Sequence, residues 1–335
     1  MSSKFEHLRR GPGDLVWLRD DGRLTALKVL EISRENPGPD LAFFAPEYDL
    51  GRSPACWFRG EVLETLPKLK STLPAIRFVR PPDEASFTRQ HKEVMEAIAR
   101  GKLKKLVPFV VEELAFESPL DWTMFSAGFE DRPGCYSFGM QVGEQGMCGF
   151  TPEILFRVRG EELTTMALAG TRAAEGPSLL EDPKEKHEHD LVIEDISQRL
   201  AGLGLMEVDE TCEIPFGKLK HLRTEIRVSL NSKPSMQDLV SRLHPTAALG
   251  GYPKSQAQPK LAKWGRHRGR FGAPFGWQKG DEMMCVVAIR GVHWSGPKAQ
   301  VFSGCGVVAG SRSEREWGEL ALKRESTKAN LGIPE

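Results

Sequence analysis

Carboxylates at helical spacing are the clearest candidates for chemistry in this sequence. The segment SEREWGELALK places Glu316, Glu319 and Lys323 three and four residues apart, so all three lie on one face of a helix. The plainer interpretation is a solvated helix face with a weak Glu319–Lys323 ion pair. By itself this segment does not decide between the two.

A second predicted helix also has an acidic side, on which Glu188, Asp195 and Arg199 flank an apolar stripe. This side, too, is explained equally well as a solvated face. Two helices that each present carboxylates can nevertheless hold Mg²⁺, which prefers oxygen ligands and keeps some of its waters. Such a site suits a substrate that carries carboxylates or phosphates.

Two glycine-bearing segments add to the candidates. In SGCG, from Ser303 to Gly306, backbone N–H groups can approach an anion closely, although a β-bulge or a tight turn explains the glycines as well. The segment HPTAALGGYPK predicts a turn at Gly250, Gly251 and Pro253.

Composition excludes several classes of protein. The 335 residues include 46 basic and 46 acidic side chains, so there is no positive excess to bind nucleic acid. The apolar run over 106–111 is far too short to span a membrane, and the start, MSSKFEHLRRGPGD, lacks the apolar core of a secretory signal. The six cysteines show neither metal-site nor disulfide spacing. We therefore expect a cytosolic protein without membrane partners.

The elements that must position these residues mix helices and strands. In the first part we predict a hairpin over 14–32, a helix from Ser86 to about Arg100 that Gly101 ends, and a strand from Lys105 that Pro108 places at an edge or bulge. The second part predicts strands over 133–172, a helix from Asp182–Pro183 to about Ala201, strand-like segments over 258–310, and a last helix near Ser313. Ser313 and Glu316 have the spacing of a capping box. Without regular βαβ alternation, the pattern favours one large α+β domain.

Ten segments, in order, resemble the chorismate-utilising family of anthranilate, aminodeoxychorismate, isochorismate and salicylate synthases. They are GKLKKLV (101–107), GFTPEILFRV (149–158), ALAGTR (167–172), DPKEKHEHDLVIEDISQRL (182–200), KHLRTEI (220–226), HPTAALGGYPK (244–254), RGRFGAPFGW (268–277), AIRG (288–291), SGCGVVAGS (303–311) and EREWGELALK (314–323). The likeness covers about 84–330, the expected catalytic region. Residues 1–80 match no motif, and we expect them to form a strand-rich part of the same fold. The resemblance implies two facing antiparallel sheets with helices outside and the active site between them.

The resemblance also implies a magnesium site and a substrate. Glu188 and Glu319 would be the Mg²⁺ ligands, with Glu316 close by and acting through water. The metal would hold the ring carboxylate of chorismate, and Gly304 and Gly306 would add backbone N–H donors to that carboxylate.

The other substrate contacts follow from the same resemblance. Arg290 would grip the enolpyruvyl carboxylate, and Lys323 would add a second cation. Gly170 and Thr171 would line the ring near the leaving hydroxyl, and His221 would lie in the pocket wall.

Three features distinguish the activities within the family. Aminodeoxychorismate synthases often carry a nucleophilic lysine where this chain has Ala169, and anthranilate synthases carry glutamine where it has Lys105. The segment HPTAALGGYPK also resembles the isochorismate version of its motif. Together they imply water as the nucleophile, and thus an isochorismate synthase.

The implied mechanism uses Lys105 as the base for water attack at C2 and Glu153 as the acid for the hydroxyl that leaves C4. A catalytic lysine base requires a lowered pKa and a glutamic acid a raised one. Lys105 alone would suggest a surface lysine in a basic cluster with Lys102 and Lys104. Strand alternation points only one of Lys104 and Lys105 inward, so the register of this strand matters.

Two departures from the family pattern stand out. Phe271 replaces a tyrosine that usually meets the enolpyruvyl carboxylate, a loss of about 1.5–3 kcal/mol if nothing compensates. Val110 replaces a usual arginine. The alternatives are a salicylate synthase and a catalytically degenerate, regulatory chorismate-binding protein. We expect no amidotransferase subunit, a monomer or weak dimer, and a product used for menaquinone or siderophore synthesis.

Overall fold

The computed structural model describes residues 13–36, 38–51, 56–66, 72–125, 134–264 and 268–334. Most of the segment MSSKFEHLRRGPGD therefore lies outside the described residues. Strands β1 (Leu15–Asp20) and β2 (Arg23–Ser33) form the predicted N-terminal hairpin. Asp21 and Gly22, at its turn, have φ angles of 46° and 82°, as a two-residue type I′ turn requires.

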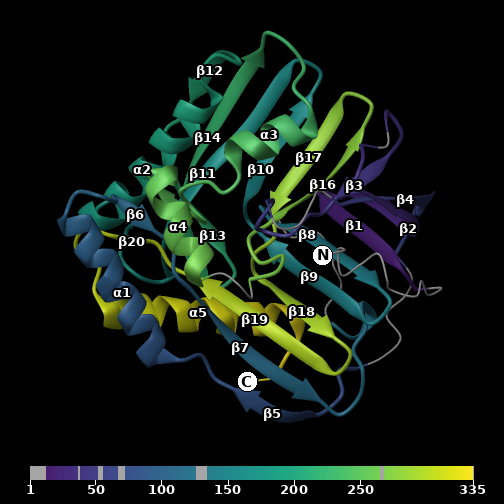
Figure 1. The fold of residues 1–335 in the computed structure, drawn as a ribbon, viewed down its shortest axis with the longest axis horizontal. Coiled ribbons are helices and arrows are strands. Elements are labelled where there is room, and N and C mark those ends of the chain that lie inside the picture. Colours follow the sequence, from purple (N-terminus) through teal and green to yellow (C-terminus); the bar gives the residue numbers. More distant parts are fainter. Residues whose placement is uncertain are drawn as a thin grey trace.

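Antiparallel strands make up most of the molecule (Figure 1). The remaining strands of the large sheet are β3 (Ala42–Phe44), β4 (Trp57–Val62), β5 (Ile76–Arg80), β7 (Phe109–Phe116), β8 (Tyr136–Val142), β9 (Gln145–Thr151), β10 (Ile154–Arg159), β11 (Glu162–Ala173), β12 (Gly204–Val208), β13 (Cys212–Phe216), β14 (Leu219–Leu230), β16 (Pro274–Lys279), β17 (Glu282–Val287), β18 (Gly291–Ser295) and β19 (Lys298–Gly304).

The pairings divide this sheet into two halves. One half runs β14-β11-β10-β17-β16-β3-β4-β2, with β12 and β13 both on the outer edge of β14. The other runs β1-β8-β9-β18-β19-β7-β5. The β1–β2 hairpin joins them, and Phe138 of β8 packs on Phe275 of β16 with ring centroids 5.3 Å apart. The expected facing sheets are confirmed, as two halves of one continuous ladder.

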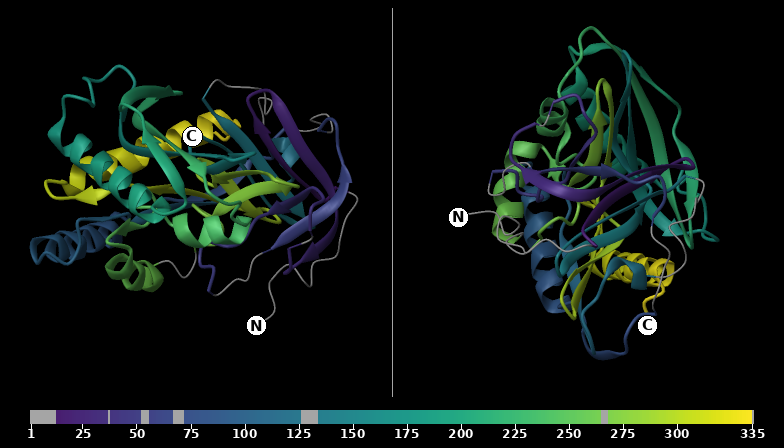
Figure 2. Two further views of the ribbon diagram at one scale, coloured as in Figure 1. Left: turned by 90° about the horizontal axis from the view of Figure 1, so that it is seen from above. Right: turned by 90° about the vertical axis from the view of Figure 1, so that its right-hand side faces the viewer.

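Five α-helices and one short 3₁₀ turn cover the described strands. They are α1 (Glu84–Ala99), α2 (Pro183–Leu200), α3 (Met236–Leu243), α4 (Lys254–Trp264), α5 (Ser313–Leu331) and the turn Trp122–Met124. Helices α1 and α2 gather toward one end of the molecule, and the N-terminal strands lie at the other (Figure 2). None of the helices in the described ranges is long and apolar enough to cross a membrane.

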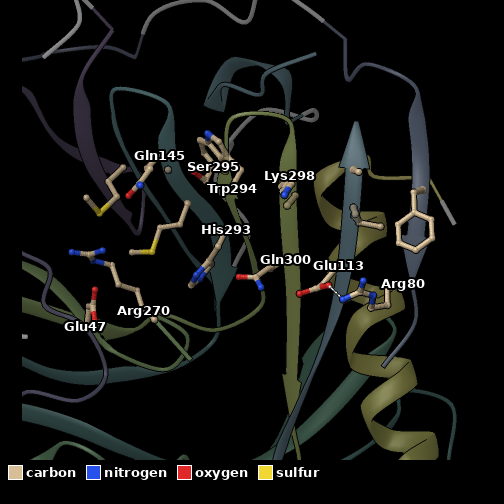
Figure 3. A pocket seen from close by; sticks show the side chains of 18 residues that line it. Glu47, Arg80, Glu113, Gln145, Arg270, His293, Trp294, Ser295, Lys298 and Gln300 are labelled. Atoms are coloured by element: carbon tan, nitrogen blue, oxygen red, sulfur yellow. Dashed lines mark hydrogen bonds and ion pairs between the residues drawn. The ribbon is translucent and has the colours of Figure 1, made fainter. Parts of the chain in front are cut away.

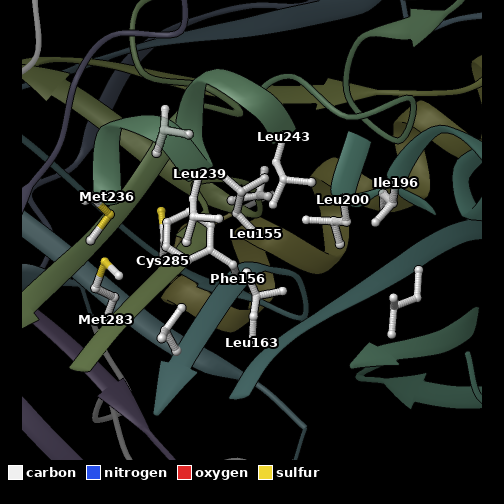
Figure 4. Packing of buried hydrophobic residues seen from close by; sticks show 14 of the residues in the cluster. Leu155, Phe156, Leu163, Ile196, Leu200, Met236, Leu239, Leu243, Met283 and Cys285 are labelled. Carbon is white, nitrogen blue, oxygen red and sulfur yellow. The ribbon is translucent and has the colours of Figure 1, made fainter. Parts of the chain in front are cut away.

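The apolar core between helices and sheet fixes the position of α2. Ile196 and Leu200 of α2 and Leu239 of α3 pack with Leu155 and Leu163 of the sheet, all fully or almost fully buried (Figure 4). Burial of a leucine or isoleucine side chain contributes about 1.5–3 kcal/mol. The opposite side of α2 is thereby left to carry the acidic residues.

The observed starts of α1 and α2 can be compared with the starts that the sequence predicts. Helix α2 begins as predicted, because the side chain of Asp182 accepts from the backbone of Lys184 and Glu185 and Pro183 follows it. The start of α1 was placed three residues late: Asp83 is its cap and accepts from the N–H of Ser86.

Two other predictions were wrong. No side chain caps α5, whose N-cap is Arg312, because the Glu316 carboxylate is engaged elsewhere. Helix α4 replaces part of the strand-like region expected over 258–310. Its pattern was hard to recognise because Pro259 lies inside it and only Ala257 and Leu261 are buried.

A separate three-stranded sheet lies beside the large one. It consists of β6 (Lys105–Leu106) between β15 (Gly251–Tyr252) and β20 (Val307–Val308). The strand predicted from Lys105 is thus interrupted at Val107–Pro108 before β7 begins. Three segments that the sequence singled out separately meet in this sheet.

Candidate active site

A small chamber collects most of the predicted site residues. Its volume is about 70 Å³. The predicted residues that line it are Glu153, Gly170, Thr171, Glu188, His221, Phe271, Arg290, Gly304, Gly306 and Lys323. The predicted set is completed by Lys105, which contacts Glu188 of this lining, and by Glu316 and Glu319, which line an adjoining cleft.

Lys105 is fully buried, and its ammonium lies 3.0 Å from Oε1 of Glu188. Lys104 points the other way, with its ammonium 3.8 Å from half-exposed Glu194 and 5.3 Å from the ring centre of Tyr252. Lys104 directly precedes the two-residue strand β6, in which Lys105 and Leu106 are both buried. Lys105 is the inward-facing lysine.

Gly306 makes the Lys105–Glu188 contact possible. A Cβ atom at this position would lie 2.0 Å from Oε1 of Glu188 and 2.7 Å from Cε of Lys105. Real Cβ atoms essentially never come this close, so any side chain here would displace the Glu188 carboxylate or the Lys105 stem. The glycine therefore lets the two groups keep this close arrangement.

Four glutamates, Glu185 and Glu188 of α2 and Glu316 and Glu319 of α5, form an acidic group around one cation, which three of them contact directly. The ammonium of Lys184 lies 3.2 Å from Glu185, 3.3 Å from Glu188 and 3.2 Å from Glu316. Burial alone would lower the pKa of Lys184, but these carboxylates raise it above its usual value. Burial raises the pKa of Glu316, and so does neighbouring Glu319.

The acidic group has the donor chemistry of a magnesium site. Its donors are all carboxylate oxygens, the ligands that Mg²⁺ prefers, and they already converge on a cation, the Lys184 ammonium. In the described part of the chain, however, no three acidic, histidine or cysteine side chains are already arranged to hold a metal ion. The donor set fits the ion, provided that Lys184 gives up its contacts.

Arg290 and His221 form a hydrogen-bonded chain in the chamber wall. Arg290 Nη2 donates to His221 Nε2 over 3.2 Å, and His221 Nδ1 lies 3.0 Å from the carbonyl oxygen of Gly170. Burial, together with the charge of Arg290, holds the pKa of His221 well below its usual range, so the ring is neutral. Gly170 presents its carbonyl because it has a φ of 72° and interrupts the β11 register.

One nitrogen of Arg290 remains available. Its Nη1 is buried and has no hydrogen-bond partner among the described residues, and the backbone of Arg290 adopts an unusual φ of 55°. A strained backbone that holds an incompletely satisfied guanidinium is typical of a functional site. An anion is the partner that this group lacks.

Glu153 lies in the turn between β9 and β10 and is 3% exposed. Burial raises its pKa to about 8, although Lys105, Lys323 and Arg290 oppose the shift. Glu153 is therefore a carboxyl group that keeps its proton near neutral pH, as a general acid must.

Helix α5 is fixed to the sheet behind the site. Lys328 lies 2.9 Å from Glu112 of β7, and Arg324 donates to Ser303 of β19 over 3.1 Å. The ammonium of Lys323, the residue before Arg324, lies 2.9 Å from the carbonyl oxygen of Gly304 and 2.5 Å from Glu319. These contacts present Lys323 to the chamber.

Phe271 lines the chamber within an aromatic group. Its ring stacks on Phe302 with centroids 5.1 Å apart and an interplanar angle of 12°, and Phe109 is 5.8 Å away. The neighbouring Arg270 does not take the place of the missing tyrosine hydroxyl, because it donates to the carbonyl of Ala45 and lines a different cavity. Val110, the other departure, is buried in the apolar cluster beneath α1 and α5.

The cavity that Arg270 lines is drawn in Figure 3. Its volume is about 630 Å³, so it is larger than the chamber. It lies over β5, β7, β19, β18 and β9, and none of the predicted catalytic, metal-binding or substrate-binding residues lines it. Its charged pair Arg80–Glu113 is already bonded at 2.9 Å. Size alone therefore does not identify the candidate active site.

Comparison with known proteins identifies the family to which the chain belongs. The family model described as "Chorismate binding enzyme" matches residues 60–332. The chain belongs to this family of chorismate-binding enzymes. Its match begins within the strand-rich part, at residue 60, and ends near the C-terminal end of α5.

Individual members of the chorismate-binding family are similar to this chain. The isochorismate synthase MenF of Escherichia coli K12 is 33% identical over 266 residues, covering 75% of this chain and 61% of that protein. A salicylate biosynthesis isochorismate synthase of Pseudomonas aeruginosa is 35% identical over 217 residues, covering 59% of this chain and 45% of that protein. The chain thus spans about half to three fifths of the length of these relatives.

Solved structures of chorismate-binding enzymes share the fold. The structure of MenF from Escherichia coli has a TM-score of 0.79 at 24% identity and covers 98% of this chain and 90% of that one. A putative isochorismate synthase, DhbC of Bacillus anthracis, has a TM-score of 0.80 at 21% identity, with 98% and 99% coverage. At this identity the likeness concerns the fold.

Sequence reasoning missed Glu185, a member of the acidic group, and Lys184, the cation at its centre. Glu185 and Glu188 are three residues apart, as are Glu316 and Glu319, so paired E-x-x-E motifs on two helices were an available signal. No sequence pattern indicates that Lys184 lies among them, because that contact depends on how α2 and α5 approach each other.

Proposed function

We propose that this chain is an isochorismate synthase, which converts chorismate to isochorismate with Mg²⁺. The observation that carries the proposal is that a buried lysine, Lys105, contacts the chamber residue Glu188, while a buried carboxyl group with a raised pKa, Glu153, lines the same chamber. The relatives named isochorismate synthases support the same reaction. The product would feed menaquinone or siderophore synthesis in the cytosol.

The residues divide the reaction between them. Lys105 would accept a proton from the water that attacks C2, and Glu153 would protonate the hydroxyl that leaves C4. Arg290, through its free Nη1, would bind the enolpyruvyl carboxylate, with Lys323 as a second cation. The backbone N–H groups at Gly304 and Gly306 would meet the ring carboxylate, and Thr171 would lie beside the ring.

Glu188, Glu319 and Glu316 would hold the magnesium ion, and Glu185 joins them as a fourth carboxylate. Bound Mg²⁺ would hold the ring carboxylate and share the charge of Glu188, the partner of Lys105. The chamber, at about 70 Å³, is smaller than the roughly 300–1,000 Å³ of most ligand sites. Substrate would therefore also need the adjoining cleft of about 550 Å³, which Glu185, Glu316 and Glu319 line.

A product assay tests the proposal directly. Purified protein with chorismate and Mg²⁺ should give a product of unchanged mass that co-elutes with isochorismate. Salicylate with pyruvate would instead support the salicylate synthase alternative. Recovery of unchanged chorismate would support the degenerate binding protein.

The role of Glu153 predicts the pH dependence. The acid form exists below its pKa of about 8, so kcat should fall as pH rises through 8. Glu153→Gln removes the proton and should lower kcat by about 10²–10⁴-fold. Glu162→Gln, at an exposed site on β11, should keep the wild-type profile. A profile that stays flat to pH 10 would exclude Glu153 as the acid.

Phe271→Tyr tests the main departure from the family. The added hydroxyl would donate to the enolpyruvyl carboxylate, so KM for chorismate should fall by up to about tenfold, or about 1.4 kcal/mol, with kcat little changed. Phe109→Tyr adds a hydroxyl to a ring that does not line the chamber and is the matched control. An unchanged or raised KM for Phe271→Tyr means that the chamber already compensates.

A further inference from the structure

Lys184 occupies the point where the two acidic helices meet. It is the second residue of α2, directly after Pro183. Its ammonium contacts Glu185 and Glu188 of its own helix and Glu316 of α5, all at 3.2–3.3 Å. One lysine therefore ties together the carboxylates of both helices.

This contact lies at the boundary between two spaces. Glu188 lines the inner chamber, whereas Lys184, Glu185 and Glu316 line the outer cleft. Thr171 borders both spaces. The Lys184 ammonium and its carboxylates thus form part of the wall between chamber and cleft.

A divalent cation at these oxygens would face a like charge. The ammonium and the ion would be within a few ångströms of each other, and they would compete for the same carboxylates. The lysine side chain is 18% exposed and has four rotatable carbon–carbon bonds, so it can turn into the outer cleft without movement of α2.

We propose that Lys184 is an internal competitor of the metal, which must leave the carboxylates before a divalent cation binds them. This inference rests on the proposed magnesium site. Departure of Lys184 removes the α2–α5 tie and opens the wall between chamber and cleft. Metal binding and access for substrate are thereby coupled through one side chain.

Calorimetric titration with Mg²⁺ alone, without chorismate, measures the competition. Lys184→Met keeps the length of the side chain and removes its charge, so Kd for Mg²⁺ should fall about tenfold or more. Lys184→Arg keeps the competing charge and should bind Mg²⁺ like the wild type. Lys186→Met removes a lysine from the exposed side of the same helix and should leave Kd unchanged.

Thermal unfolding gives a second readout. In chelator, Lys184→Met should have a lower Tm than the wild type, because the carboxylates lose their only shared cation in the described structure. Millimolar Mg²⁺ should raise the Tm of Lys184→Met more than that of the wild type. Lys184→Gln replaces Lys184→Met if the latter does not fold.

The outcomes separate the two proposals. If Lys184→Met binds Mg²⁺ no more tightly than Lys186→Met while the wild type is active with Mg²⁺, the competitor role is wrong and the proposed function stands. If no variant binds Mg²⁺, the metal site fails, and the role of Lys184 fails with it.

Discussion

Replacement of Lys105 by alanine should reduce conversion of chorismate by about a thousandfold, within the 10²–10⁴ range of a general base. Lys105 is the inward residue of β6 and is fully buried beside Glu188. Chorismate should still bind, because Arg290 and Lys323 remain in place. Product formation measured alongside calorimetric binding of chorismate separates loss of catalysis from loss of binding.

Lys104→Ala is the matched control, since Lys104 is adjacent in sequence but pairs with Glu194 at the surface. It should retain most of the wild-type rate. Lys105→Ala also leaves the buried Glu188 carboxylate with one cation fewer, which can lower the stability of the fold. The Tm of each variant should therefore be measured. Lys105→Gln provides a less disruptive alternative. Loss of activity in Lys104→Ala and not in Lys105→Ala would reverse the assignment.

Removal of divalent metal should abolish turnover, and Mg²⁺ should restore it. Glu188→Gln keeps the shape of the side chain but removes the charge that the metal and Lys105 share. A bound metal ion contributes several kcal/mol to the stabilisation of a transition state, so this variant should lose at least about a hundredfold in rate. Activity titrated against free Mg²⁺ checks both expectations.

The control for this variant is Glu194→Gln, on the same helix but half-exposed, where the carboxylate meets Lys104 and Tyr252 instead of the acidic group. Its rate and Mg²⁺ dependence should match the wild type. Full turnover by the wild type in excess chelator would rule out the metal.

Local signals in the sequence were enough to predict several elements. The Asp182–Pro183 start of α2 depends on backbone groups within one turn, and the β1–β2 turn depends on two residues that accept positive φ. The choice of Lys105 over adjacent Lys104 came from the resemblance to the family, because the local pattern of the two lysines does not fix the register of the strand.

The errors arose where distant segments compete for a residue. Glu316 has the spacing of a capping-box partner, but its carboxylate pairs with Lys184 of another helix. Asp195 was grouped with the acidic side of α2, yet it accepts from Arg199 and from the N–H of Ala247, which is a structural role. Helical periodicity identifies a face and does not say what that face meets.

The glycine at position 306 has a use beyond this protein. Because a Cβ there would displace the Glu188 carboxylate and the Lys105 stem, a relative with a larger residue at the aligned position would have to hold the two groups in a different arrangement. A change at this one backbone position would therefore point to an altered contact between the lysine and the glutamate.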